Sequence, residues 1–252
     1  MRIFVLVKRV PDTGIPLRVK SDRTGIDKEG IPHVINPYDE YAVEAGLRIK
    51  EKFQSCELIA LSCGDENSIE IIRHALAMGA DKGVLLKVNE EIYDSIRIGE
   101  IIGDYLLKEN PDVILLGKKS VDYDRGIVPA IISEKLNMPF ISCVVNIDFK
   151  NSGFIFERET EYGVEIIEAK PPLIISFEKA KFEPRFPSLR GVMMAKKKVI
   201  DIKEINELPY VSTQIMSYEP PPERKKGKII NLPFPENVKE LVRLLKEEAK
   251  II

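Results

Sequence analysis

Short apolar runs alternate with longer segments of helical periodicity along the first 150 residues, and this alternation constrains the fold most. The runs are typical of strands that are buried on both faces of a parallel sheet. Each intervening segment is long enough to be the crossover that parallel neighbours require. The predicted strands are residues 3–7, 58–61, 84–86, 112–116 and 140–145. The predicted helices are residues 36–53, 69–79, 96–107 and 127–137. The fold class is therefore predicted to be α/β, with a doubly wound, mostly parallel sheet.

The pattern changes after residue 150, where turn residues and prolines become frequent. Two alternating runs, 154–159 and 164–168, flank Tyr162-Gly163 and predict a β-hairpin. Residues 171–177 predict one more strand. Residues 182–198 hold two prolines and no sustained period, which predicts an extended arm.

Residues 204–235 are richer still in proline and are followed by an amphipathic helix, Glu236–Lys250. This tail has no evident core within its own chain to pack against, so we expect it to wrap around a partner subunit. The predicted organisation is an α/β nucleotide-binding domain at 1–180, a partner-recognition arm at 181–203, and a proline-rich segment with a C-terminal wrapping helix at 204–252.

Composition excludes several classes of function. The chain has 252 residues with Lys+Arg 38 and Asp+Glu 40, so no basic field favours a nucleic-acid partner. Cys56, Cys63 and Cys143 form no C-x-x-C pair and His33 lies far from His74, so neither a metal site nor a disulfide framework is expected. No apolar run reaches the roughly 18 residues of a membrane span, and the first run is short for a signal peptide. We expect a cytoplasmic location.

Three loops are predicted to meet at one edge of the sheet. Val7–Arg9, Ser62–Gly64 and Gly117–Gly126 each follow a predicted strand, and ligands of open α/β sheets bind at the carboxyl ends of the strands. The third loop is long, polar and basic, and it leads into a helix whose N-terminus offers free N–H groups. These features predict a site for a nucleotide phosphate, although an ordinary strand-to-helix connection is the simpler interpretation of the loop alone.

Several longer motifs occur in order over nearly the whole chain. They are Val7–Thr13, Asp22–Gly25, Asn36–Glu44, Ala75–Asp81, Leu116–Asp124, Glu183–Leu189 and Met194–Lys198. With these motifs the sequence resembles the β subunit of electron-transfer flavoproteins.

The resemblance implies an adenine-nucleotide site within this subunit and a redox-active FAD shared with a partner α subunit. It implies no catalytic residue and no metal ligand in this chain. The implied nucleotide contacts are Leu6, Asn36, Pro37, Tyr38, Asp39, Cys63, Gly117, Lys118, Lys119, Ser120, Val121, Asp122, Tyr123, Asp124, Arg125, Gly126, Ile127 and Val128. It also implies that Leu189 is the tip of a recognition loop for a dehydrogenase; alternatively, this leucine packs under its own loop.

Two features leave the identity of the nucleotide open between AMP and a second FAD. Ile127 stands where the family often has Gln, and Arg125 replaces a small residue, so a guanidinium is available to phosphate in place of an amide. This changed phosphate loop favours AMP, which ordinary members of the family hold. Val10–Thr13, in contrast, resembles the electron-bifurcating members, which hold a second FAD. Asp122 and Asp124 are expected to cap a helix or to bind ribose or backbone, and Cys63 to be an apolar neighbour of adenine.

Three functions follow as alternatives. The first is an electron carrier subunit, rather than a catalyst, that works between dehydrogenases and a quinone reductase or ferredoxin. The second is a bifurcating enzyme subunit that oxidises NADH at the second FAD. The third is a stand-alone adenine-nucleotide sensor, which the arm and the terminal helix disfavour.

Overall fold

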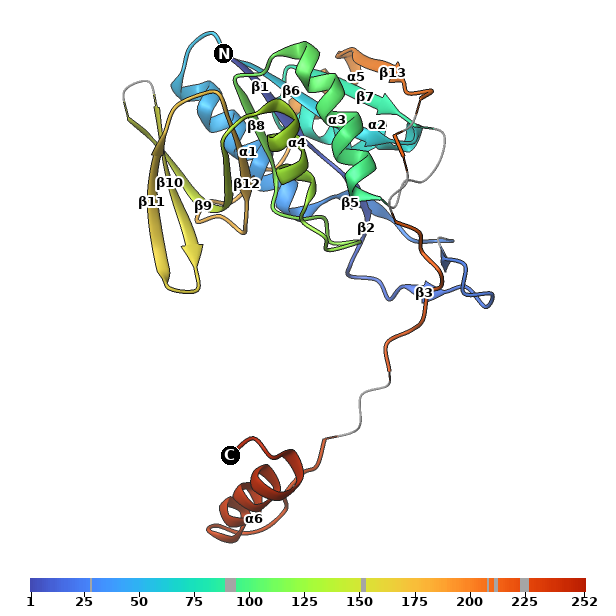
Figure 1. Cartoon of the computed structure of the whole chain (residues 1–252), viewed down its shortest axis with the longest axis vertical. Helices are drawn as coiled ribbons and strands as arrows, with labels where there is room; N and C mark the ends of the chain where they lie inside the picture. Colours follow the sequence, from blue (N-terminus) through green and yellow to red (C-terminus); the bar gives the residue numbers. More distant parts are fainter. Residues whose placement is uncertain (28, 89–93, 151–152, 208, 211–212, 223–226) are drawn as a thin grey trace. The chain divides into compact units, whose positions relative to one another are not determined.

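The computed structural model describes residues 1–27, 29–88, 94–150, 153–207, 209–210, 213–222 and 227–252. They form two compact units, Met1–Tyr218 and Glu219–Ile252. The first unit is built on a nine-stranded sheet with the order β11-β10-β9-β12-β8-β1-β6-β7-β13 (Figure 1). Every neighbouring pair from β9 to β13 in this order is parallel, and β10 and β11 are antiparallel. The predicted α/β fold class with a mostly parallel sheet is confirmed.

The strands of this sheet are β1 (Arg2–Leu6), β6 (Glu57–Gly64), β7 (Lys82–Lys87), β8 (Val113–Gly117), β9 (Phe140–Lys150), β10 (Gly153–Thr160), β11 (Gly163–Ala169), β12 (Leu173–Phe177) and β13 (Ile200–Glu204). The hairpin predicted around Tyr162-Gly163 is the β10–β11 pair. Two small ladders join β2 (Arg9–Pro11) to β5 (His33–Ile35) and β3 (Arg18–Val19) to β4 (Ile26–Asp27).

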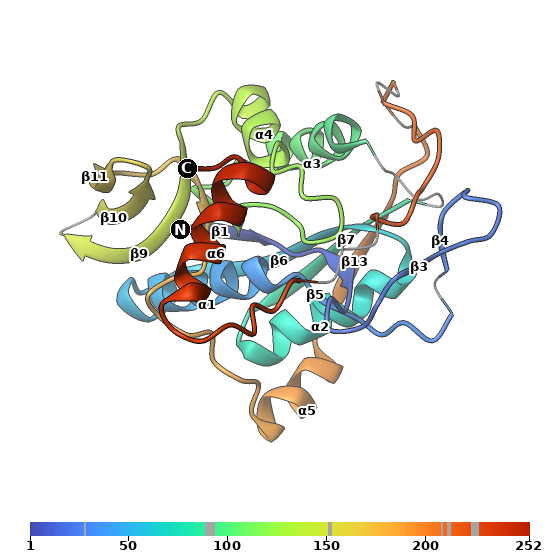
Figure 2. The same ribbon diagram turned by 90° about the horizontal axis from the view of Figure 1, so that it is seen from below.

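The helices of the first unit are α1 (Pro37–Lys52), α2 (Ile69–Met78), α3 (Ser95–Glu109), α4 (Val128–Leu136) and α5 (Leu189–Lys197), with a short 3₁₀ turn at Glu66–Ser68. Helices α1 and α2 lie on one face of the sheet and α3 and α4 on the other (Figure 2). Alternate residues of β1 supply the two cores, since Ile3 and Val5 pack with α1 and α2 whereas Phe4 and Leu6 pack with α3 and α4. This two-sided burial makes the sheet doubly wound.

The arm predicted to be extended over 182–198 is interrupted by a helix. Ser188 caps α5, because its hydroxyl accepts a hydrogen bond from Gly191 N at 3.0 Å. Only Ala195 of this helix is buried, and the apolar side chains of Leu189, Val192 and Met193 are exposed. The chain then returns to the main sheet, where β13 pairs in parallel with β7.

The second unit contains α6 (Glu236–Leu244), which continues into a π-helical turn at Leu245–Ala249. A helix was predicted here at 236–250. No residue of α6 is buried, and its apolar side chains Val238, Leu241 and Val242 are each 47 % exposed. Between residues 205 and 235 the described segments contain neither helix nor strand. No helix in the described ranges is both long and apolar enough to cross a membrane.

Candidate functional site

A cavity of about 630 Å³ opens at the carboxyl ends of β1, β6 and β8. Strand β1 lies between the other two, so the chain order changes direction at this point, where α/β sheets bind ligands. Most of the predicted contact residues line it. They are Leu6, Asn36, Asp39, Cys63, Gly117, Lys118, Lys119, Ser120, Asp122, Tyr123, Arg125, Gly126 and Val128.

Five predicted contact residues lie outside the cavity lining. Pro37 is an exposed residue at the start of α1, and the Tyr38 ring lies 5.1 Å from Lys118 Nζ. Val121 and Asp124 belong to the loop, where Val121 N donates to Asn36 and Asp124 pairs with Lys119. Ile127 lines a separate shallow groove between α3 and α4, together with exposed Ile96.

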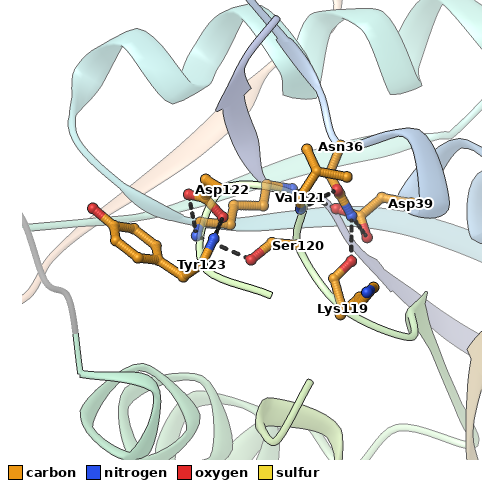
Figure 3. A network of polar contacts seen from close by, with 8 residues as sticks. Asn36, Asp39, Lys119, Ser120, Val121, Asp122 and Tyr123 are labelled. Carbon is orange, nitrogen blue, oxygen red and sulfur yellow. Dashed lines mark hydrogen bonds and ion pairs between the residues drawn. The ribbon is translucent and has the colours of Figure 1, made fainter. Parts of the chain in front are cut away.

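Asn36 joins the start of α1 to the loop after β8 (Figure 3). Its side-chain amide donates to Lys119 O at 3.0 Å and to Asp39 Oδ1 at 2.9 Å, and its Oδ1 accepts from Val121 N at 3.1 Å. The sequence predicts Asn36 as a conventional helix cap, but its side chain makes no capping hydrogen bond to α1. The loop backbone offers it both a donor and an acceptor, so Asn36 fixes the loop instead.

Asp39 is the centre of this network. Its carboxylate accepts hydrogen bonds from Lys8 N at 2.8 Å and Gly117 N at 3.0 Å, in addition to Asn36. A Cβ at Gly117 would lie 2.5 Å from Asp39 Oδ1 and 2.6 Å from Tyr38 Cβ, so only glycine permits this approach. Burial raises the pKa of Asp39 to about 7, against the three N–H donors, which favour its charged form.

This pKa predicts a pH-dependent stability. The folded chain holds a proton on Asp39 up to about pH 7, whereas the unfolded chain loses it near the ordinary value of 3.8. The free energy of unfolding should therefore fall as pH rises between these values, by at most about 1.4 kcal/mol per pH unit. Urea titrations of wild type and Asp39→Asn at several pH values measure this contribution. If the free energy of unfolding depends on pH equally in the two proteins, the hydrogen-bond donors keep Asp39 ionised throughout this range.

Lys8, Lys118 and Lys119, which lie in or beside the loop, already have carboxylate partners. Lys8 Nζ lies 2.6 Å from Asp122 Oδ2, Lys119 Nζ lies 2.7 Å from Asp124 Oδ1, and Lys118 pairs with Glu178. Asp122 also accepts from the backbone N–H of Tyr123, as the sequence suggested, but neither aspartate caps α4.

Arg125 differs from these lysines. Within the described ranges it has no carboxylate partner, and its Nη1 lies 3.4 Å from the Thr213 hydroxyl. The neighbouring Gly126 has a φ of 65°, which a β-branched residue adopts only with strain. Exposed Arg125 therefore offers an uncompensated charge to an anion beside a sharply turned backbone.

Comparisons with known proteins agree on one family. The Electron transfer flavoprotein domain matches residues 24–208. The chain is 35 % identical to the electron transfer flavoprotein subunit beta of Dictyostelium discoideum, over all of this chain and 99 % of that one. It is 34 % identical to the Homo sapiens subunit beta and 33 % to that of Bacillus subtilis, with the same full coverage of this chain and 99 % and 100 % of theirs.

The chain belongs to the electron transfer flavoprotein β-subunit family. Membership implies an α-subunit partner and a flavin in the assembled protein. The described residues of this family member contain no cluster of His, Cys, Asp and Glu that could hold a metal ion. Burial raises the pKa of the Cys63 thiol to about 12, so it lines the cavity as a neutral group and not as a nucleophile.

One wall of the cavity in this β subunit consists of residues that the sequence did not predict. The segment between β2 and β5 contributes Leu17, Ile26 and Ile31, and Tyr218 contributes from far along the chain. Tyr218 N donates to Arg23 O at 2.9 Å, which holds the two parts together. Apolar residues in a turn-rich stretch with no core of its own are the signal that could have indicated this wall.

Proposed function

We propose that this chain is the β subunit of a heterodimeric electron carrier and holds an adenine nucleotide in the 630 Å³ cavity. The observation that carries the proposal is the Gly117–Val128 loop, which places Arg125 and the N-terminus of α4 at the carboxyl ends of three strands. Backbone N–H groups and a guanidinium are the donors that phosphate prefers. The apolar wall that includes Leu6 and Cys63 suits the adenine ring.

In the proposed carrier, the redox-active FAD is shared with the α subunit. Electrons pass through it from a dehydrogenase to a quinone reductase or ferredoxin. This chain supplies the nucleotide site and the docking arm, with no acid–base or nucleophilic step of its own. All three cysteines are free, which suits a reducing compartment, and we assign the protein to the cytoplasm.

A second candidate function has an observation of its own. The cavity continues to Leu17, Ile26 and Ile31, beyond the strand ends where a mononucleotide would lie. A ligand longer than AMP would use this wall, as would the second FAD of a bifurcating subunit that oxidises NADH.

The docking arm of the proposed carrier presents Leu189. This side chain is 88 % exposed in the first turn of α5, so it does not pack under its own loop. Phe186 and Met193 are also largely exposed, at 95 % and 69 %. Apolar side chains held in water at one site favour a protein partner.

Co-purification with the α subunit tests the proposal. We expect a stable heterodimer that buries more than ~2,000 Å², and aggregation or self-association of this chain when it is produced alone. Released cofactors counted by absorbance and chromatography should give one FAD and one AMP per heterodimer. Two FAD and no AMP would instead establish the bifurcating candidate. A well-behaved monomer without affinity for the α subunit, or a heterodimer without nucleotide in this chain, would overturn the proposal.

A further inference from the structure

The segment that carries Phe186 and Leu189 lacks a core of its own, so something else must fix its position. This segment leaves the core beneath α1 and α2 at Phe182. Phe182 is 6 % exposed and packs against the Tyr41 and Phe177 rings at centroid distances of 6.3 Å. Between Phe182 and Ser188 the chain forms neither helix nor strand. Arg185 lies in the middle of this stretch.

Arg185 reaches back to α1 with most of its donors. Its Nε and Nη2 donate to the two oxygens of Glu44, at 2.7 and 3.0 Å, and its Nη1 donates to Glu51 at 2.6 Å. Its backbone N–H also donates to Glu44 Oε2, at 3.2 Å. Both the side chain and the main chain of Arg185 are therefore fixed to one helix. The two-oxygen fork is a geometry that lysine does not reproduce.

Glu44 is well suited to hold this contact. The residue is 4 % exposed, and its second cationic partner is Arg48, whose Nε lies 3.2 Å from Oε1. Arg48 in turn lies over the Phe182 ring, 4.2 Å from its centroid. Burial would raise the pKa of Glu44, but hydrogen bonds from Arg185 and Arg48 hold it below its ordinary value. A buried carboxylate fixed by two arginines is a rigid point of attachment.

The other end of the segment is fixed to α2. Arg73 Nη1 donates to Ala195 O at 2.6 Å and to Lys198 O at 2.5 Å, where α5 ends. Gly191 packs so closely on Ala77 O that a Cβ would overlap with it. Phe186 and Leu189 thus lie between two attachments that belong to the main unit.

We propose that Arg185, through its fork with Glu44, is a positioning residue that holds Leu189 in the conformation that docks to the dehydrogenase. This inference rests on the proposed docking function of Leu189. An arm fixed before binding loses less conformational entropy in the complex than a free arm does. The affinity for the partner should therefore depend on Arg185 even though this residue need not touch the partner.

The test uses the heterodimer and, from a panel of flavin-dependent dehydrogenases, the one that reduces wild type fastest. We expect Arg185→Ala to raise the KM for the heterodimer about five- to ten-fold with kcat little changed, because positioning is lost and not the electron-transfer step. Arg185→Lys should bring the KM part of the way back to the wild-type value. Glu51→Gln, which alters the exposed carboxylate partner of Arg185, is the matched control. Its KM should stay within about two-fold of the wild-type value. Hydrogen exchange of residues 186–194 should rise in Arg185→Ala and stay at the wild-type level in Glu51→Gln.

A double-mutant cycle separates the inference from the function on which it rests. If Arg185 acts through Leu189, adding Arg185→Ala to Leu189→Ala should leave KM unchanged. Additive effects, or a wild-type KM in Arg185→Ala, would overturn the positioning role. A wild-type KM in Leu189→Ala would overturn the docking function itself. If Arg185→Ala fails to assemble with the α subunit, Arg185→Lys decides: a KM raised about three-fold supports the fork, and a wild-type KM rejects it.

Discussion

Gly126→Val is expected to leave the purified heterodimer without nucleotide in the β subunit. The φ of 65° at this position is disfavoured for valine, and an added Cβ would lie 3.2 Å from Lys118 O. The loop would have to change shape, and its backbone N–H groups would then no longer face a phosphate. Measurement of released nucleotide by chromatography checks this result.

The control for Gly126→Val is Gly163→Val in the β10–β11 turn. Gly163 also has a positive φ, of 138°, but no described residue other than its chain neighbours comes within 4 Å of the point where a Cβ would lie. The turn is also remote from the cavity lining. Its replacement should strain the hairpin and leave the nucleotide content at the wild-type level. Loss of nucleotide from both variants would indicate general destabilisation.

Removal of the Arg125 charge beside Gly126 should have a smaller but measurable effect on nucleotide binding. Arg125→Ala should weaken nucleotide binding by about 1.5–3 kcal/mol, the range for hydrogen bonds to charged groups. Lys119→Ala should weaken it less, because Asp124 already compensates the Lys119 charge. Calorimetric titration of nucleotide-free heterodimer would show the difference. Wild-type affinity in both Gly126→Val and Arg125→Ala would mean that the phosphates lie elsewhere.

Leu189→Ala is expected to slow electron transfer from the dehydrogenase about ten-fold or more. Burial of one leucine in a partner pocket contributes about 1.5–3 kcal/mol, and 1.4 kcal/mol corresponds to a factor of ten. Because Leu189 is 88 % exposed in this chain, its truncation should leave flavin content, nucleotide content and Tm close to wild type. Steady-state rates at sub-saturating heterodimer give the effect.

Leu107→Ala is the matched control for Leu189→Ala. Leu107 is 58 % exposed on α3, across the sheet from the helices that hold the arm. Its replacement should change neither rate nor Tm. If Leu189→Ala instead lowers Tm by several degrees and keeps the dehydrogenase rate, Leu189 is a packing residue and the docking role is wrong.

Most of the elements that the sequence predicts bury their own residues. Val113–Leu116 form an apolar run because β8 is buried on both faces, and α1 to α4 each present apolar residues to one core. Helix α5 buries only Ala195, and the contacts of Ser188 and Arg73 stabilise it, so burial of its own apolar residues does not explain why it forms. Strand β13 pairs at the sheet edge with mostly exposed side chains, so it has no apolar run.

The same distinction applies to the candidate site. The loop after β8 could be predicted because a polar, glycine-containing stretch follows a buried strand. The role of Asn36 could not, since a helix cap and a link to Val121 require the same side chain and only tertiary structure decides between them. The wall of Leu17, Ile26 and Ile31 depends on packing between distant segments, which local patterns do not encode.

The strand order of the sheet sets a late step in the folding of this chain during synthesis. Strand β12 lies between β8 and β9, although it follows both in sequence, so β9 has no place in the main sheet until residues 173–177 have left the ribosome. Before that point β8 presents a free hydrogen-bonding edge lined with buried-type residues. Such edges pair with other chains, and sheets closed by distant strands fold slowly. Nascent chains that stall before residues 173–177 have emerged from the ribosome should therefore aggregate far more than chains that stall after these residues have emerged.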